Sequence, residues 1–220
     1  MLQSVASVYL LPQATMLALD RQLRDFYWNC WSPAYIHPIV WDSICQPIAM
    51  GGLGIRSISG TSKAALLRQV WMITLNKHTC WNLWVHARYL RGNSIWDVSI
   101  LRQASWGWKN ILQFRTLAKN HIKFLIGNGH ITKFWTDPWL NGGRLKDCYG
   151  DRAIYDLGLG ADVYVRHFIA DGIWRFSTPT SNSLMEIFQL VPTKVEPWGD
   201  FEDEVVWTLE DNGKFTFNSA

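Results

Sequence analysis

The sequence predicts an α+β fold, mainly α-helical in its N-terminal part and with short β-hairpins in its C-terminal part. Apolar residues recur every three or four positions through most of the first part, which is the period of an amphipathic helix. Two Asn-Gly pairs, Asn128-Gly129 and Asn212-Gly213, each separate two short runs of strand-forming residues, the pattern of a tight hairpin. The charge changes near the same border: residues 1–133 carry 14 Lys and Arg against four acids, and residues 134–220 carry seven against 14.

Four helices are expected in the basic part of the chain. They span residues 12–28, 61–76, 79–91 and 105–119. Thr61-Ser62 and Ser105 are suited to cap the second and the fourth of these helices. We expect the third helix to bury the face that carries Trp81 and Trp84, because tryptophans at helical spacing usually belong to a core.

The second part is expected to be built from short strands. The first hairpin comprises residues 121–126 and 130–135, and the second comprises residues 205–209 and 214–217. A lone strand at 173–176 and a short helix at 183–190, closed by Pro192, lie between the hairpins. The patterns divide the chain into regions at 1–120, 121–200 and 201–220.

Composition excludes several classes of protein. No apolar run is long enough for a transmembrane helix, so no membrane partner is expected. The N-terminus lacks a basic segment before its apolar stretch, which argues against a signal peptide. Cys30, Cys45, Cys80 and Cys148 are far apart, as expected of reduced thiols in an intracellular protein of the nucleus or cytoplasm, not a secreted one.

The motifs of catalysis are missing from the pattern. Residues 51–54, Gly-Gly-Leu-Gly, lack the Lys-Ser/Thr of a phosphate loop and are expected to form a tight turn. The six histidines are scattered, and the acidic run Glu202-Asp203-Glu204 is expected to be a solvated loop. No catalytic residue, metal ligand or cofactor is therefore predicted.

The basic part instead indicates contact with nucleic acid. Lys and Arg neutralise phosphates, and aromatic rings stack on unpaired bases. The alternative interpretation is that the tryptophans belong to the core and the basic residues solvate the helix backs. The candidate contact residues are Arg21, Arg24, Lys63, Arg68, Arg88, Arg91, Lys109, Arg115, Lys119, Lys123, Lys133, Trp106 and Trp108. The expected partner is RNA or an RNA–DNA hybrid, and the oligomeric state stays open.

Five stretches in the same order resemble plant LINE-type (non-LTR) retrotransposon reverse transcriptases. They are WDSICQP with MGGLGI (41–55), KAALLRQVW (63–71), SWGWKNIL (105–112), IGNG with FWTDPWL (126–140), and Trp207 with NGKFT (207–216). Each stretch alone is weakly specific, but the five together cover most of the chain. Ile48 and Met72 stand where the family often has Lys and Arg, which puts phosphate contact at these two positions in doubt.

The resemblance implies a segment that follows the polymerase palm. In these terms residues 1–120 are a thumb-like helical region, 121–200 a small β-containing connection and 201–220 the truncated start of the reverse-transcriptase zinc-binding region. The paired aspartates of the palm are absent, so we expect a non-catalytic fragment that binds the template–primer backbone in the full-length protein. Two alternatives remain: a domesticated Trp-rich protein-interaction module, or an accessory part of an active RNA-directed DNA polymerase encoded separately.

Overall fold

The computed structural model describes residues 11–29, 39–76, 79–140, 143–197, 199, 201–217 and 219. The helical elements are α2 (Gln13–Tyr27), α3 (Trp41–Ile44), the 3-10 helix η1 (Ile48–Met50), α4 (Ile58–Thr74), α5 (Cys80–Val85), the π-helix η2 (His86–Leu90), α6 (Trp106–Lys119), α7 (Leu145–Leu157), the 3-10 helix η3 (Val165–Phe168) and α8 (Asn182–Lys194). The strands are β1 (Ile122–Leu125), β2 (Ile169–Ala170), β3 (Ile173–Trp174) and β4 (Glu204–Trp207). Helices and two antiparallel strand pairs confirm the predicted α+β class.

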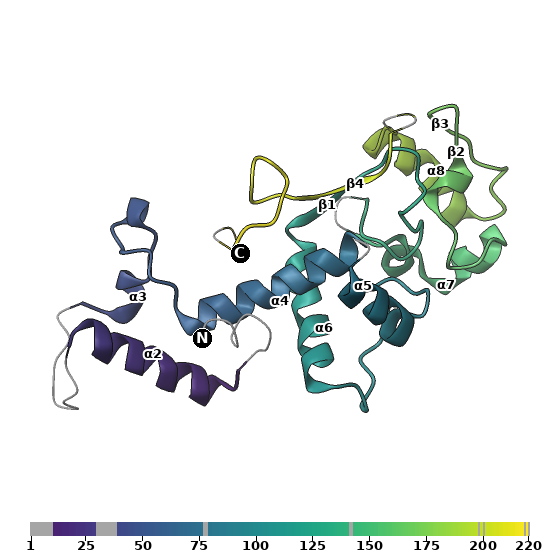
Figure 1. Ribbon diagram of the computed structural model, residues 1–220. Helices are drawn as coiled ribbons and strands as arrows, with labels where there is room; N and C mark the ends of the chain where they lie inside the picture. The colour runs from purple at the N-terminus through teal and green to yellow at the C-terminus, as the bar shows by residue number, and fades with distance from the viewer. Residues whose placement is uncertain are drawn as a thin grey trace.

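Helix α4 lies at the centre of the molecule and packs against α6 (Figure 1). At one end of α4 lie α2, α3 and η1, and at the other end lie α7, α8 and the β2–β3 pair. A helix that is apolar around most of its circumference is one that other elements enclose. The buried apolar residues of α4 are Ile58, Ala64, Ala65, Leu66, Leu67, Val70, Trp71 and Ile73.

Helix α2 joins the molecule through the start of α4. Met16 packs on Ile58 in a small apolar cluster separate from the main core. Oδ1 of Asp20 accepts a hydrogen bond of 2.9 Å from the backbone N–H of Ile58, one of the N–H groups that the first turn of a helix leaves free. Ser57 caps the same turn, because its hydroxyl accepts from Gly60 N at 3.0 Å.

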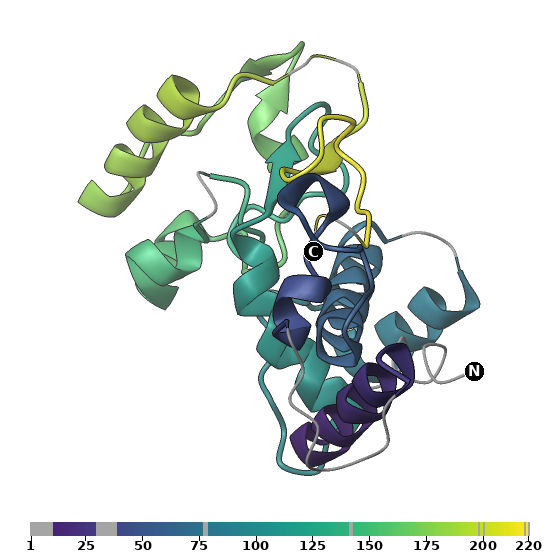
Figure 2. The same ribbon diagram turned by 90° about the vertical axis from the view of Figure 1, so that its left-hand side faces the viewer.

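The main core is continuous from Leu66 to Trp207, so all three predicted regions of the sequence contribute to it. Trp207 is fully buried, and its indole contacts the rings of Trp71 and Phe215. In the turned view of Figure 2, α7 and α8 lie on the left of β1, and α4 and α5 lie on its right. Strand β4, which pairs with β1, therefore completes the core between the α7–α8 side and the α4–α5 side.

The prediction of a hairpin from 121–126 and 130–135 is wrong. β1 pairs antiparallel with β4 instead, with Ile122 opposite Trp207 and Leu125 opposite Glu204. Residues after β1 do not return as a strand, because their backbone N–H groups turn toward the side chain of Asp203, as described below. The local Asn-Gly signal is overridden by a partner more than 70 residues away.

The second predicted hairpin is half correct. β4 forms, and a turn follows it in which Gly213 N donates to Glu210 O at 3.0 Å. Residues 214–217 are not a strand, and Phe215 packs edge-to-face on Trp207 with ring centroids 4.9 Å apart. The predicted lone strand at 173–176 is shorter and pairs with β2 across Asp171-Gly172, both of which have positive φ angles.

The predicted helices are confirmed with changed ends. α4 begins at Ile58, so Thr61 and Ser62 are buried inside the helix and do not cap it. Helix 183–190 extends as α8 to Lys194, with Pro192 inside it. Helix α7 was not predicted from the sequence. It consists of two helical segments joined at Gly150, where the backbone is not helical.

Candidate nucleic-acid interface

Aromatic side chains form a continuous series of ring contacts on α5, η2 and α6. Thr79 caps α5, because its hydroxyl accepts from Asn82 N at 3.2 Å. The rings of Trp81 and Trp84, one turn apart, are stacked, with centroids 5.4 Å apart and an interplanar angle of 30°. The next contact, from Trp84 to Tyr89, has centroids 5.3 Å apart in an edge-to-face arrangement.

The π-helix η2 explains the contact between Trp84 and Tyr89. Its wider turn is closed by a hydrogen bond of 2.7 Å from Arg91 N to His86 O, five residues earlier. This wider turn brings side chains five positions apart together, and π-helical turns are frequent at functional sites. Tyr89 then stacks on Trp108 at 4.5 Å with an interplanar angle of 12°.

The exposure of the tryptophans differs from the prediction. Trp81 and Trp84, expected in the core, are 43% and 49% exposed, whereas Trp108, expected to contact nucleic acid, is 4% exposed. The cause is the short α5 followed by η2: the inward positions are Val85 and Leu90, five residues apart, and a regular helix would not align them. No residue pattern indicates the π-helix, so the outward position of these two indoles was not predicted.

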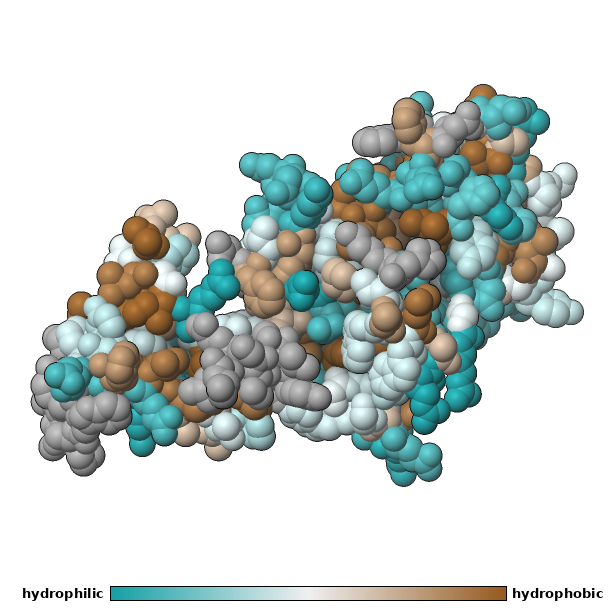
Figure 3. Space-filling model, in the orientation of Figure 1, coloured by the Kyte–Doolittle hydropathy of each residue, from teal (hydrophilic) through white to brown (hydrophobic). Residues whose placement is uncertain are grey.

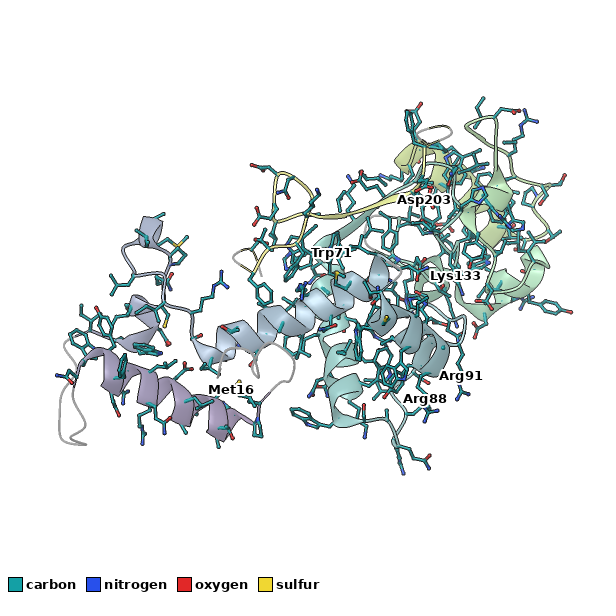
Figure 4. All side chains as sticks on the ribbon, in the orientation of Figure 1. Met16, Trp71, Arg88, Arg91, Lys133 and Asp203 are labelled. Atoms are coloured by element: carbon teal, nitrogen blue, oxygen red, sulfur yellow. The ribbon has the colours of Figure 1, made fainter. Side chains whose placement is uncertain are left out.

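Two arginines belong to the same stretch of chain as these rings. Arg88 and Arg91 are exposed, and neither takes part in an ion pair within the described part of the chain. Figure 4 shows the two close together, below the helical turns of α5 and η2. Trp106, 51% exposed, begins α6 next to Ser105, whose hydroxyl lies 3.2 Å from that of Tyr89.

We call the surface formed by Trp81, Trp84, Arg88, Arg91 and Trp106 the aromatic–basic face. Pale and teal side chains dominate the part of Figure 3 that covers α5 and the end of α6. The carboxylate of Asp97, six residues after Arg91, already forms ion pairs with Arg144 and Lys146, both at 3.1 Å. The face therefore combines exposed ring surface with positive charge.

Lysines form a second basic surface beside β1. Lys119 and Lys123, both predicted contact residues, line a groove of about 530 Å³ together with Lys194 and Glu196. Lys123 is exposed on β1, and Lys119 is half-buried at the end of α6. The groove brings together charges that are distant in the sequence.

Arg115 is half-buried and Lys133 is buried, and the charged group of each binds the protein itself. The guanidinium of Arg115 donates to Ile95 O at 2.8 Å and to Val98 O at 2.6 Å, and burial lowers its pKa below the ordinary value. The ammonium of Lys133 donates to Gly92 O and pairs with Asp162 at 2.6 Å. Both groups fix the loops around α5 and η2.

The remaining predicted residues are dispersed. On α2, Arg21 is exposed and Arg24 pairs with Asp25 at 3.3 Å. On α4, Lys63 and Arg68 are exposed, and the guanidinium of Arg68 lies over the ring of Phe217. Lys109 is half-buried and donates to Arg102 O at 2.6 Å. The structure thus places the predicted residues in separate groups, two of which form surfaces.

The expectation of a solvated acidic run at 202–204 is wrong for its middle residue. Asp203 is 7% exposed and lies at the centre of a loop, residues 127–132, near the label in Figure 4. Its Oδ1 accepts from Gly127 N at 2.9 Å and from Gly129 N at 2.7 Å. Its Oδ2 accepts from Ile131 N at 3.2 Å and from the backbone N–H and hydroxyl of Thr132 at 3.1 and 2.9 Å.

A second buried acid, Asp137, connects three loops. Its carboxylate accepts from Ser94 Oγ at 2.5 Å and from Lys133 N at 2.8 Å. Burial raises the pKa of Asp137 to about 6, although both hydrogen bonds oppose that shift. Asp137 and Asp203 both accept hydrogen bonds from groups of the protein itself, so their role in this geometry is to stabilise the fold.

The glycine-rich segment at 51–54 is the tight turn that was predicted. A Cβ at Gly52 would lie 2.0 Å from Gln46 O, and Gly54 N donates to Gln46 O at 2.9 Å. Gly51 has a positive φ angle of 84°. The cysteines in the described part of the chain, Cys45, Cys80 and Cys148, are free thiols.

Within the described ranges, no group of three or more His, Cys, Asp or Glu side chains is placed to hold a metal ion. None of the helices in that part of the chain combines the length and the apolar character needed to cross a bilayer.

Comparison with known proteins finds relatives among plant proteins. The chain is 26% identical over 224 residues to an Arabidopsis thaliana protein that carries the provisional name of ribonuclease H protein, an alignment that covers 97% of this chain and 35% of that protein. It is 28% identical over 124 residues to an uncharacterized mitochondrial protein of the same plant, which covers 56% of this chain and 80% of that protein. No family model matches the chain, and no solved structure matches it. The chain thus spans about a third of the first relative.

Proposed function

We propose that this chain is a non-catalytic fragment of a LINE-type retrotransposon reverse transcriptase that holds the template–primer duplex by contacts to its phosphate backbone. The single observation that carries the proposal is the aromatic–basic face, where Arg88 and Arg91 are exposed without an ionic partner in the described part of the chain. Such contacts are electrostatic and independent of base sequence.

The lysine groove beside β1 supports the same proposal. Lys119, Lys123 and Lys194 face one concave surface with one acid, Glu196, among them. Cations gathered in one groove are complementary to the phosphates of a nucleic-acid strand. Basic residues on α2 and α4 extend the positive charge toward the other end of the molecule.

The comparisons support the coarser part of the proposal, a retrotransposon-related plant protein. One relative is named for ribonuclease H, and the similarity to it extends over 97% of this chain. The polymerase family, the non-catalytic role and the binding of nucleic acid go further than these names and rest on the sequence motifs and the two basic surfaces.

Binding of a labelled RNA–DNA hybrid across a salt series tests the proposal. We expect log K to fall linearly with log salt, with a slope of roughly −0.9 for each phosphate contact on a duplex. Arg88→Gln combined with Lys123→Gln should make the slope shallower by about one to two units. Arg152→Gln on α7, an exposed arginine outside both surfaces, is the matched control and should leave it unchanged. Absence of binding by the unaltered chain at low salt would overturn the proposal.

A second candidate function, a protein-interaction module, is favoured by a different surface. Apolar side chains on α2, on η1, just before α3 and just after η1 are exposed; Figure 3 shows several of them as brown patches at the left. They are Leu17, Phe26, Ile39, Val40, Ile48, Met50 and Leu53, with exposed fractions between 50% and 77%. Apolar surface of this extent marks contact sites on folded proteins. Ile48→Gln with Met50→Gln, which adds no charge, should reduce self-association or partner binding without changing hybrid affinity.

A further inference from the structure

We propose that the stacked pair Trp81 and Trp84 is a platform for the unpaired bases of single-stranded RNA or DNA. This inference rests on the proposed function and adds a substrate class to it: the strand end or overhang beside the duplex. Both indoles are close to half exposed, and both belong to one turn of α5.

The rings are held in place before any ligand arrives. Trp84 contacts Tyr89, and Tyr89 stacks on Trp108, which is anchored in the main core. The hydroxyl of Tyr89 also lies 3.2 Å from that of Ser105, the cap of α6. Because this series fixes the rings, little side-chain entropy remains to be lost on binding.

The chemistry of the surroundings favours a nucleic-acid occupant over an apolar protein surface. Arg88 follows Trp84 by four residues and Arg91 is the C-cap of the π-helix, so two exposed cations lie in the same short stretch of chain as the rings. A stack of indoles with adjacent arginines is complementary to a base with its phosphate. The faces of bases are covered in a duplex and open in a single strand, so unpaired bases are the ligand that fits.

The test compares two ligands, a single-stranded oligonucleotide that contains 2-aminopurine and a blunt RNA–DNA hybrid. Trp81→Ala with Trp84→Ala should lower single-strand affinity roughly tenfold to hundredfold and abolish the quenching of 2-aminopurine. Hybrid affinity should fall much less than single-strand affinity, because the base faces are covered in a duplex, and the salt slope for both ligands should stay the same, because stacking releases no counterions. Tyr155→Ala, at an exposed aromatic residue of α7, is the control and should change nothing.

Trp81→Phe with Trp84→Phe separates stacking from folding. The phenyl rings keep a π-face, so most of the single-strand affinity should return. Thermal melting shows whether each variant is folded.

Equal loss for single strand and hybrid, or no loss for either, would overturn the inference. An unaltered chain that forms dimers, which the alanine variant converts to monomers, would also overturn it. If the unaltered chain binds the hybrid and the tryptophan changes have no effect, the inference fails alone; if it binds neither ligand, the proposed function fails as well.

Discussion

The carboxylate of Asp203 does for residues 127–132 what a neighbouring strand does for a β-strand: it accepts their backbone N–H groups. Five donors converge on its two oxygens. Buried N–H groups that lose their acceptor cost free energy of desolvation, so a single acid determines the conformation of a whole loop.

Replacement of Asp203 should therefore be strongly destabilising. Asp203→Ala leaves four backbone donors and one hydroxyl without their acceptor, and we expect the free energy of unfolding to fall by about 3–5 kcal/mol. Glu202→Ala, at an exposed neighbour, should change it by less than about 0.5 kcal/mol. Urea denaturation followed by tryptophan fluorescence measures both, and similar losses for the two variants would contradict the prediction.

Asp137 predicts a dependence of stability on pH. Its pKa is about 6 in the folded protein against an ordinary value of 3.8, because burial disfavours the charged form. The folded state thus binds the proton more tightly than the unfolded state. The contribution of this side chain to stability is greatest below about pH 4, declines as the pH rises to 6 and stays at its lowest above that.

Asp137→Asn isolates this contribution. The amide resembles the protonated acid, since its oxygen can accept from Lys133 N and its NH₂ can donate to the Ser94 hydroxyl. We expect the stability of the unaltered protein, measured relative to the variant, to fall between pH 4 and pH 6.5, by up to about 3 kcal/mol. Chemical denaturation at several pH values measures this difference, and a flat difference would refute the assignment.

At the scale of elements, glycines decide which segments can approach each other. A Cβ on Gly129 would lie 2.4 Å from Arg166 N, and the backbone there has a φ angle of +70°. Gly107 in α6 is the opposite case, because nothing lies within 4 Å of the Cβ that it would gain. The loop at 127–132 therefore depends on glycine, whereas the helix does not.

Gly129→Ala should lower stability by about 2–4 kcal/mol, through the close approach and the left-handed backbone together. Gly107→Ala should raise stability by about 0.5–1 kcal/mol, as expected for a helical position in open space. Thermal melting of the two variants gives opposite shifts. A Gly129→Ala protein that melts with the unaltered chain would show that this loop can relax.

The period of apolar residues predicts elements well where contacts are local. The bounds of α2 and α6 follow from it within a residue or two, and Ser105 is the cap that the sequence indicated. The exposed face of α5 was not predictable, because η2 changes the number of residues per turn and no residue type specifies a π-helix. The predicted contact residues therefore include Arg88 and Arg91 of the aromatic–basic face but not its two stacked indoles.

For the whole molecule, the sequence could not reveal which strands pair. β1 and β4 are separated by almost 80 residues, and Asp203, which precedes β4 and binds the loop after β1, belongs to a run of acids that predicts a solvated loop. The motifs at 126–140 that carry the family resemblance are largely buried: Phe134, Trp135 and Trp139 belong to the core. They identify a fold more directly than a contact with nucleic acid.

The pairing of β1 with β4 has a consequence for synthesis on the ribosome. When residue 132 leaves the exit tunnel, the acceptor for its N–H group still lies 71 positions downstream. The helices can form early, but the centre of the molecule must wait until β4 has been translated. A nascent chain that stalls before residue 203 would present its apolar interior to chaperones, and its maturation is expected to be slow because loop closure over such a span comes late.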